Sequence, residues 1–352
     1  MAQNYATEYS KNVAERFKIG SFTESMVSND YKFVGNKTVQ VYSVNTVAMN
    51  DYNRTGSSPS ASRYGTISNL GNTLQEMTMQ KDRSFTFAID RGDLEESQQV
   101  MEAGKALRRQ LDEVTTPEID KYRFQKWIEG SGTLKQLATA PSSTTILASI
   151  LELGGDMTNA GVPAEGRTLI LPVSQYIKLK EQIIDSYRGA GDAALSRGTV
   201  GQLDNMTVKM VPDSYLTSGV YFMIKYNGST VDPMKLNDYH THDNPMGVSG
   251  FVVEGRFIYD SFVIGAKGAG IGVCGSSDAV LNAPVMSIAS HAVTITPVSG
   301  VEFYYTVDGT DPHYSSTAQK YTSAVTLTSG QTLKACGRKS GCASITGEKA
   351  YE

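Results

Sequence analysis

The sequence predicts an α+β protein that ends in a small, separate all-β domain. Three observations support this fold class. Residues 93–116 have the apolar period of one long helix, and residues 143–187 alternate between helix and strand patterns. From residue 277 onward, short β-rich runs are separated by turn residues about every ten positions. With 352 residues, the chain is long enough for two or three domains with hydrophobic cores.

The composition argues against several classes of protein. The formal net charge is −4, so the chain lacks the basic surface of a protein that grips nucleic acid. No apolar run is long enough to span a membrane, and residues 1–17 lack the apolar core of a signal peptide, which predicts a protein made and used without secretion. The cysteines are too few for a disulfide framework and have no histidine partners at zinc spacing; they are Cys274, Cys336 and Cys342.

The first 90 residues are expected to form an arm and a long β-hairpin. Residues 1–31 are polar and form an N-terminal arm that needs neighbours to become ordered. Residues 32–90 contain two β-rich runs, 32–49 and 74–89, separated by a polar tract, 50–72. A hairpin of this length cannot bury itself, so we expect its partner to be another subunit.

The second β-rich run has the alternation of a half-buried strand. Phe85, Phe87 and Ile89 alternate with Ser84, Thr86 and Ala88. We therefore expect the two phenylalanines to lie on the apolar face of the strand and to take part in contacts between subunits.

Residues 93–116 are expected to form a spine helix within a segment that covers residues 91–142. Asp93 and Glu96 resemble a capping box at its start, and the late Arg108 and Arg109 complement the helix dipole. At 1.5 Å per residue the helix would be roughly 36 Å long. A second helix, carrying the only tryptophan, Trp127, is expected after it. The apolar stripe of the spine helix consists of Val100, Gly104, Leu107, Leu111 and Val114.

Residues 143–249 are expected to form an α+β domain around a small sheet, and residues 250–276 to return to the preceding domain. The elements expected in these two segments are a helix over 143–161 that ends at a glycine, a buried strand over 168–171, an amphipathic helix through Tyr176, Leu179, Ile183 and Tyr187, a glycine-rich loop over 189–201, short strands over 206–211 and 220–226, and a long β run over 250–265.

This order of segments resembles a tailed-phage major capsid protein of the Hong Kong 97 type. The segments that carry the resemblance are the polar arm, the hairpin, the spine helix, PEIDKY, NAGVPAEGRTLILPVSQYIKL, GTVGQLDNMTVKMVP and FVVEGRFIYDSFVIGAKGAGIGV. The resemblance covers roughly residues 1–275. It implies that residues 32–90 are the extended loop, that the spine helix belongs to a peripheral domain, and that residues 143–249 form the axial domain.

Residues 277–352 are expected to form a small β-sandwich. The run YYTVDGTDP at 304–312, with Leu333-Lys334-Ala335, Gly341 and Ser344, resembles the immunoglobulin-like C-terminal module of chitobiase and β-hexosaminidase enzymes, which implies an immunoglobulin-like fold for these residues. Such modules accompany enzymes without being catalytic. The expected turn of this module contains Tyr305, Asp308, Gly309, Asp311 and Pro312.

Several short motifs have a chemical and a structural interpretation, and the structural one is favoured for each. The glycines of residues 270–275 match a dinucleotide-binding pattern, but no helix is expected after them, so we interpret them as a strand end and linker. His240 and His242 could bind a metal, but no third ligand is evident and their neighbours indicate a loop. The Arg91-Gly92-Asp93 tripeptide spells a cell-adhesion motif, but we interpret it as the start of the spine helix.

The aspartates and cysteines of the C-terminal region have the same two kinds of interpretation. Asp308 and Asp311 could be an acid–base pair or calcium ligands, but in a DGTDP turn they are expected to bond their own backbone. Cys336 and Cys342 could form a cross-hairpin disulfide, although free thiols are the default in a reducing cytoplasm. We expect no enzyme activity, cofactor or metal.

The resemblance implies a structural function in a virus. Many copies would assemble, as hexamers and pentamers, into the icosahedral shell of a tailed double-stranded DNA bacteriophage in the bacterial host cytoplasm. Its partners would be other copies of the chain, a separate scaffolding protein, a portal, packaged DNA as a non-specific neighbour, and host or mucosal glycans at the outer domain. The residues expected to serve assembly are Val100, Leu107, Leu111, Val114, Arg108, Arg109, Phe85 and Phe87.

Further expectations concern covalent locking, scaffolding and the outer domain. Some members of the family join a lysine of the extended loop to a neighbour's asparagine, but no lysine lies between Met49 and Gln80, so no such crosslink is expected. An arm of about 30 residues is too short for a fused scaffold. Residues 277–352 should lie outside the shell, because a domain roughly 30 Å across would displace DNA inside it. The alternatives are an encapsulin-type compartment and a carbohydrate-binding surface protein.

Overall fold

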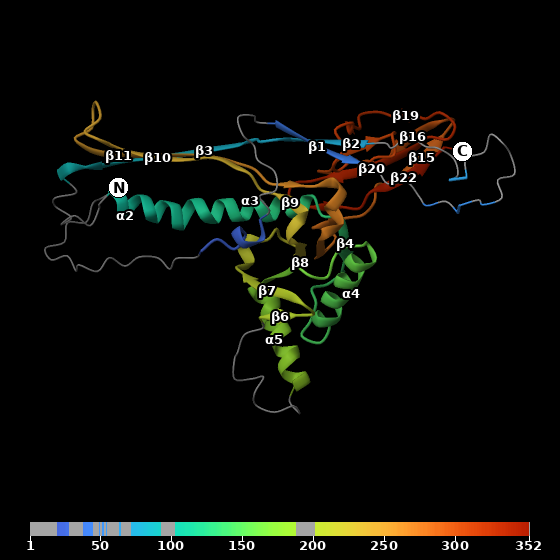
Figure 1. Cartoon of the computed structure of the whole chain (residues 1–352), viewed down its shortest axis with the longest axis horizontal. Coiled ribbons are helices and arrows are strands. Elements are labelled where there is room, and N and C mark those ends of the chain that lie inside the picture. The colour runs from blue at the N-terminus through green and yellow to red at the C-terminus, as the bar shows by residue number, and fades with distance from the viewer. Residues whose placement is uncertain are drawn as a thin grey trace. The chain divides into compact units, whose positions relative to one another are not determined.

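The computed structural model describes residues 20–27, 38–44, 49, 51–52, 54, 63–64, 72–92, 103–187 and 201–351 (Figure 1). The chain divides into two compact units. The first unit consists of Met1–Lys37, Met79–Asn282 and Arg338–Ile345, and the second of Thr38–Thr78, Ala283–Gly337 and Thr346–Glu352. The predicted boundary at residue 277 differs from the boundary at 283, and an eight-residue segment near the C-terminus belongs to the first unit.

A continuous helix of the first unit extends over the described residues Ala103–Glu129. It consists of α2 (Ala103–Gln110), a π-helical turn η2 (Leu111–Thr115) and α3 (Thr116–Glu129). The predicted spine helix is confirmed over residues 103–116, and its predicted start over 93–102 lies outside the described residues. The helix predicted to follow it, which carries Trp127, is confirmed as α3 and continues from the spine helix without a gap. Pro117 has no N–H to donate, and the wide turn immediately before it lets the helix pass this residue without a break.

A three-stranded antiparallel sheet of the first unit contacts this helix. Its order is β10 (Met234–Asp243), β11 (Gly250–Tyr259), β3 (Lys81–Asp90). Figure 1 shows the helix beside these strands. The interpretation of His240 and His242 as loop residues is wrong, because both lie in β10 and pair with β11.

The long predicted hairpin is only partly present. Strand β1 (Thr38–Val44) pairs with β2 (Asn72–Thr78) in the second unit, which confirms the first part of the hairpin. The run predicted as one strand over 74–89 is interrupted at Met79 and Gln80, and β3 pairs with β11 instead. The apolar face of β3 explains this pairing, since Phe85 stacks against Phe257 of β11.

A six-stranded mixed sheet forms the core of the remainder of the first unit. Its order is β4 (Thr133–Gln136), β13 (Ile271–Gly275), β8 (Val220–Tyr226), β5 (Arg167–Pro172), β7 (Met206–Val211), β6 (Gln202–Leu203). Helices α4 (Ile146–Asn159) and α5 (Val173–Tyr187) pack on it (Figure 1). The predicted helix and strand pattern of this region is confirmed. The predicted glycine-rich loop lies outside the described residues except for Gly201.

The glycine pattern at residues 270–275 lies in β13, as interpreted, and no helix follows it. A Cβ atom at Gly272 would lie 2.9 Å from the sulfur of Met157 and 3.2 Å from Leu153, so glycine allows α4 to pack closely on the sheet. The core between this sheet and its helices includes Ile146, Ile150, Leu153, Met157, Leu169, Leu171, Leu179, Phe222 and Ile224.

Short elements complete the first unit. The strand pairs are β9 (Thr230–Val231) with β12 (Phe262–Val263), and β14 (Val280–Leu281) with β21 (Ala343–Ser344). The 3₁₀ turns are η1 (Glu24–Met26), η3 (Asp213–Tyr215), η4 (Asn227–Ser229) and η5 (Gly265–Gly270).

The C-terminal part of the second unit is a small sandwich of two sheets, as predicted. One sheet has the order β15 (Met286–Ala289), β16 (Ala292–Ile295), β19 (Val325–Thr326). The other has the order β18 (Gln319–Lys320), β17 (Glu302–Thr306), β20 (Thr332–Arg338), β22 (Gly347–Ala350). The sandwich core consists of Val293, Ile295, Phe303, Leu327, Leu333 and Ala335. Among the described residues, no helix has the length and apolar character needed to cross a membrane.

Candidate assembly region of the first unit

The sheet β10–β11–β3 has an apolar face that packs against the long helix. Phe85 of β3 stacks on Phe257 of β11 with ring centroids 6.1 Å apart, and both belong to a cluster with Ile119 of α3. A Cβ atom at Gly255 would lie 2.6 Å from the Phe85 ring, so the glycine makes room for this phenylalanine. Helix and sheet are thus held together as one element by aromatic packing.

The predicted apolar stripe of the helix is buried only in part. Leu107 is 9% exposed, whereas Val114 is 48% exposed. Leu111 is partly buried against the cluster around Phe257, and Val100 lies outside the described residues. The difference between Leu107 and Val114 follows from the π turn. The N–H of Thr116 bonds the carbonyl of Leu111, five residues back, so the π turn contains one residue more than an α-helical turn. The extra residue changes the direction in which the side chains of the stripe point around the helix.

The π turn borders a groove of about 210 Å³ between the helix and the sheet. Arg83 and Phe85 of β3 line one side, while Val114 and Glu118 line the other. The carboxylate of Glu118 accepts a hydrogen bond from Arg83 Nε at 2.7 Å and one from the Tyr259 hydroxyl at 3.4 Å. Burial, with the charge of Glu118, raises the pKa of Tyr259 to about 12, so this tyrosine stays neutral at physiological pH.

The two arginines assigned to assembly form ion pairs within their own helix. Arg108 lies 3.9 Å from Asp112 and Arg109 lies 3.3 Å from Glu113, both at the i,i+4 spacing. Exposed pairs of this kind contribute little stability. Contacts of these arginines with another subunit stay a prediction.

The opposite face of the sheet is polar and exposed. His240 bonds Asp238 at 3.1 Å and His242 bonds Glu254 at 2.8 Å, while Arg256 bonds Asp82 at 2.6 Å. Among the described residues, no cluster of three or more histidine, cysteine or carboxylate ligands could hold a metal. The sheet is therefore amphipathic: its aromatic face packs on the helix and its charged face is exposed.

A buried aspartate, Asp120, fixes the segment Gly20–Val27 to α3. Its carboxylate accepts hydrogen bonds from Ser21 Oγ at 2.9 Å, from the Phe22 N–H at 2.8 Å and from Thr23 Oγ1 at 2.5 Å. Two lysines hold the same segment from the six-stranded sheet. Lys209 Nζ donates to the Phe22 carbonyl at 3.1 Å, and Lys225 Nζ donates to the Met26 carbonyl at 2.6 Å.

A second buried aspartate, Asp232, bonds the only tryptophan of the chain. It accepts hydrogen bonds from Trp127 Nε1 at 3.0 Å, Thr230 Oγ1 at 2.7 Å and Ser261 Oγ at 2.5 Å. The Lys225 ammonium lies 4.4 Å from the centre of a Trp127 ring. Burial lowers the pKa of Lys225 to about 8, and the nearby Asp232 partly opposes this shift.

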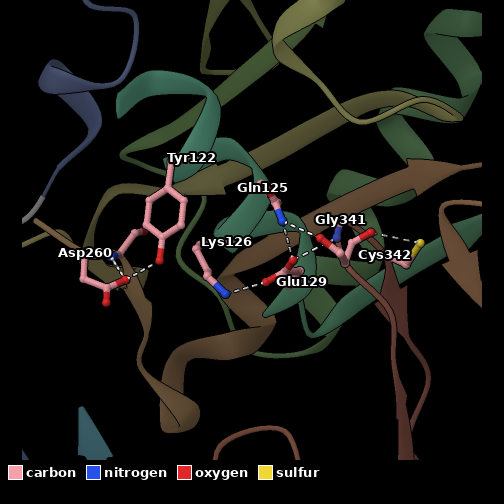
Figure 2. A network of polar contacts seen from close by, with 9 residues as sticks. Tyr122, Gln125, Lys126, Glu129, Asp260, Gly341 and Cys342 are labelled. Atoms are coloured by element: carbon pink, nitrogen blue, oxygen red, sulfur yellow. Dashed lines mark hydrogen bonds and ion pairs between the residues drawn. The ribbon is translucent and has the colours of Figure 1, made fainter. Parts of the chain in front are cut away.

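A third buried aspartate, Asp260, joins the helix to the start of β3. The Tyr122 hydroxyl donates to it at 2.7 Å, and the Gln80 N–H donates at 2.8 Å (Figure 2). Burial raises the pKa of Tyr122, and the hydrogen bond to Asp260 raises it further. The lysines Lys81 and Lys126 lie 5.0 and 5.8 Å from the centre of the Tyr122 ring.

Sequence reasoning did not identify these three aspartates. A signal was present for Asp260, which interrupts the apolar run FIYDSFVI, where a charged side chain needs buried partners. Asp120 carries no such signal, because Glu118 and Lys121 beside it are also charged. The partners of the three aspartates come mostly from distant segments, so no local pattern could identify them.

The predicted turn of the sandwich places its aspartates as local acceptors. Asp308 accepts from the Thr310 N–H at 3.0 Å, and Asp311 accepts from the His313 N–H at 2.9 Å. Gly309 has a φ of +79°, and Pro312 is buried. The Tyr305 hydroxyl donates to Gln319 at 2.9 Å. All three cysteines are free and buried.

Comparisons with known proteins show similarities for both parts of this chain. The family model described as "Chitobiase/beta-hexosaminidase C-terminal domain" matches residues 287–346. No curated protein matches the sequence. A solved structure of Mycobacterium phage Che8 has a TM-score of 0.62 at 18% identity, covering 78% of this chain and 98% of that chain. The capsid structure of the cyanophage P-SCSP1u has a TM-score of 0.61 at 11% identity, covering 77% of this chain and 93% of that chain.

The mature capsid of bacteriophage PhiM1 is a further match, with a TM-score of 0.57 at 12% identity, covering 78% of this chain and 93% of that chain. The chain has a phage capsid fold. The predicted fold class is confirmed, and so is the resemblance of the C-terminal region to the chitobiase-type module.

Proposed function

We propose that this chain is the major capsid protein of a tailed double-stranded DNA bacteriophage. The observation that carries the proposal is the fold match, because it includes 93–98% of the phage chains that are compared. Little of those chains is left unmatched, so the similarity extends over a whole capsid subunit and is not limited to one shared motif.

The surfaces of the first unit support assembly as the function. Val114 and Tyr239 are exposed apolar side chains beside a sheet that is charged on its other face. Residues of this kind gain burial when a second copy covers them. The residues proposed to serve assembly therefore remain Val100, Leu107, Leu111, Val114, Arg108, Arg109, Phe85 and Phe87, with Leu107 and the phenylalanines acting by holding the helix and sheet together.

The remaining partners are proposals that follow from this function. The chain would form hexamers and pentamers in the host cytoplasm and reside in the virion capsid, with a separate scaffolding protein, a portal and packaged DNA as neighbours. The sandwich would lie outside the shell, where its main effect is steric or stabilising and host glycans are candidate ligands.

Electron microscopy of the full chain, expressed alone and with a candidate scaffolding protein, tests the proposal. We expect closed icosahedral shells with one surface knob for each subunit. A monodisperse monomer under both conditions would argue against assembly as the function of the chain. Shells isolated from their natural host that contained a protein cargo and no DNA would support the encapsulin-type alternative instead.

A second expected result concerns covalent locking of the shell. No lysine lies between Met49 and Gln80, so this part of the extended loop lacks the amine for a lysine–asparagine crosslink. Boiled and reduced particles should run as a single band near the 38.1 kDa of the chain. A ladder of high-mass bands would show that another lysine supplies the crosslink.

A further inference from the structure

A short segment of the C-terminal region, Arg338–Ile345, belongs to the first unit. We call these residues the clip. The chain enters the clip from Gly337 and leaves it at Thr346, both of which belong to the second unit. The chitobiase-type family match covers the clip as well, since it extends over residues 287–346. The clip therefore lies within the sequence of the chitobiase-type module but packs in the first unit.

Backbone hydrogen bonds join the clip to the segment that follows the central sheet. Strand β21 pairs in parallel with β14, so that Val280 lies opposite Ala343. The Ala343 N–H donates to the Ala279 carbonyl at 2.9 Å, and the Ile345 N–H donates to the Leu281 carbonyl at 3.1 Å. Ala343, Val280 and Ala279 are fully buried. The pairing is therefore a buried structural contact of the first unit.

The end of α3 provides a second set of contacts. The Gly341 N–H donates to Glu129 Oε1 at 2.8 Å, and Gln125 donates to Ser340 Oγ at 2.8 Å and to Glu129 at 2.9 Å (Figure 2). Lys126 pairs with the other oxygen of Glu129 at 2.8 Å. An acidic residue at a helix C-terminus is unfavourable to the helix dipole. Glu129 is stabilised there by the lysine and by the clip.

Gly341 is required for the clip to adopt its conformation. Its φ is +73°, and a Cβ atom would lie 2.8 Å from both Oγ1 and Cγ2 of Thr217. Any other residue would be strained in its backbone and would also collide with Thr217. Figure 2 shows Cys342 next to it, whose thiol donates to the Asp278 carbonyl at 3.0 Å.

We propose that the first unit needs the clip in order to fold, although the clip belongs to the sequence of the C-terminal module. The module is then more than a removable decoration, because the first unit is complete only when residues 338–345 are present. This goes beyond the proposed capsid function and holds whether or not the chain forms shells.

Native-state hydrogen exchange of the unassembled full chain in increasing guanidinium chloride tests the proposal. The amides of Gly341, Ala343 and Ile345 should become exchangeable at the same denaturant concentration as those of α3, and not with those of β17 and β20. Exchange of the clip in step with the sandwich strands would overturn the proposal. So would exchange of the clip at a concentration far below that of α3, since a loosely attached segment opens on its own.

Matched glycine variants distinguish packing of the clip from backbone strain. Gly341→Ala should speed exchange of the clip and of residues 279–281 at least tenfold and leave β17 and β20 unchanged. Gly300→Ala is the control, because Gly300 has a φ of +74° with nothing within 4 Å of the added Cβ. The double variant Gly341→Ala with Thr217→Ala should regain part of the protection, since the two colliding atoms are removed. Equal effects of Gly341→Ala and Gly300→Ala on clip exchange would overturn the proposal.

Glu129→Gln gives a second, milder variant that should fold. The amide oxygen can still accept from Gly341, but the ion pair with Lys126 is lost, so clip exchange should rise less than in Glu129→Ala. If neither variant changes the exchange of the clip, the contact with α3 does not hold it and the proposal fails. The exchange measurement needs no particles, so its outcome is independent of the electron microscopy test of the capsid function.

Discussion

Replacing Asp232 with alanine should lower the free energy of unfolding of the first unit by about 3–5 kcal/mol, the usual cost of removing one partner from a buried charged group. Three donors would lose their acceptor: Trp127 Nε1, Thr230 Oγ1 and Ser261 Oγ. The ammonium of Lys225, fully buried beside Trp127, would also lose the charge of Asp232, which favours its protonated form. Guanidinium unfolding of the unassembled chain measures the effect through fluorescence, because Trp127 is the only tryptophan.

Two control variants test whether the loss of stability comes from the buried donors that Asp232 bonds. Asp213→Ala removes an exposed aspartate that accepts one hydrogen bond, from the Ser174 N–H at 3.1 Å, and should cost less than about 1 kcal/mol. Asp232→Asn keeps an acceptor oxygen and should lie between the two alanine variants. If Asp232→Ala unfolds at the same denaturant concentration as Asp213→Ala, the hydrogen bonds to Asp232 contribute no net stability.

The elements predicted correctly from sequence are those with a strong local period. The broad apolar face of α4, the fully buried strand β5 and the strands β7 and β8 follow from residues within a few positions of each other. The alternation of Phe85 and Phe87 likewise predicts strand β3. Its pairing with β11 depends on residues about 170 positions away, so the run over residues 32–49 was wrongly expected to be its partner.

The extra residue of the π turn explains why the predicted apolar stripe of the long helix is not buried along its whole length. Pro117 is ordinarily a sign of a helix end, yet the helix continues through it. The π turn at Leu111–Thr115 carries the helix past this proline, and the added residue leaves Val114 exposed. The spacing of apolar residues before residue 111 is that of a regular α-helix, so it does not predict the π turn that follows.

The candidate assembly region was predicted less completely than the fold. The aromatic face of the sheet could be foreseen from β3, but the aspartate contacts and the clip could not. Asp120 bonds residues 97–99 positions earlier, and Gly341 bonds a glutamate 212 positions earlier. Such contacts depend on the completed fold, and the polar sequences around Asp120 and Gly341 give no local sign of them.

Raising the pH from about 6 to above 9 should destabilise the sandwich by on the order of 3 kcal/mol through His313. Burial, the largest influence, lowers the pKa of His313, but hydrogen bonds with Asp311 and Cys336 outweigh it and raise the pKa from 6.5 to about 9. The Asp311 carboxylate lies 2.9 Å from His313 Nδ1, and this imidazole is only 8% exposed.

The sign of the effect follows from proton binding. The folded state holds the His313 proton more tightly than the unfolded state, so the stabilisation is fully present below about pH 6.5 and is lost as the pH rises through about 9. Pulse proteolysis of the full chain in urea at several pH values, with fragments of the sandwich followed by mass, measures the loss. His313→Gln should flatten the pH dependence between 6.5 and 9, whereas His291→Gln, at an exposed position, should leave it intact. An unchanged pH dependence in His313→Gln would mean that another group binds the proton on folding.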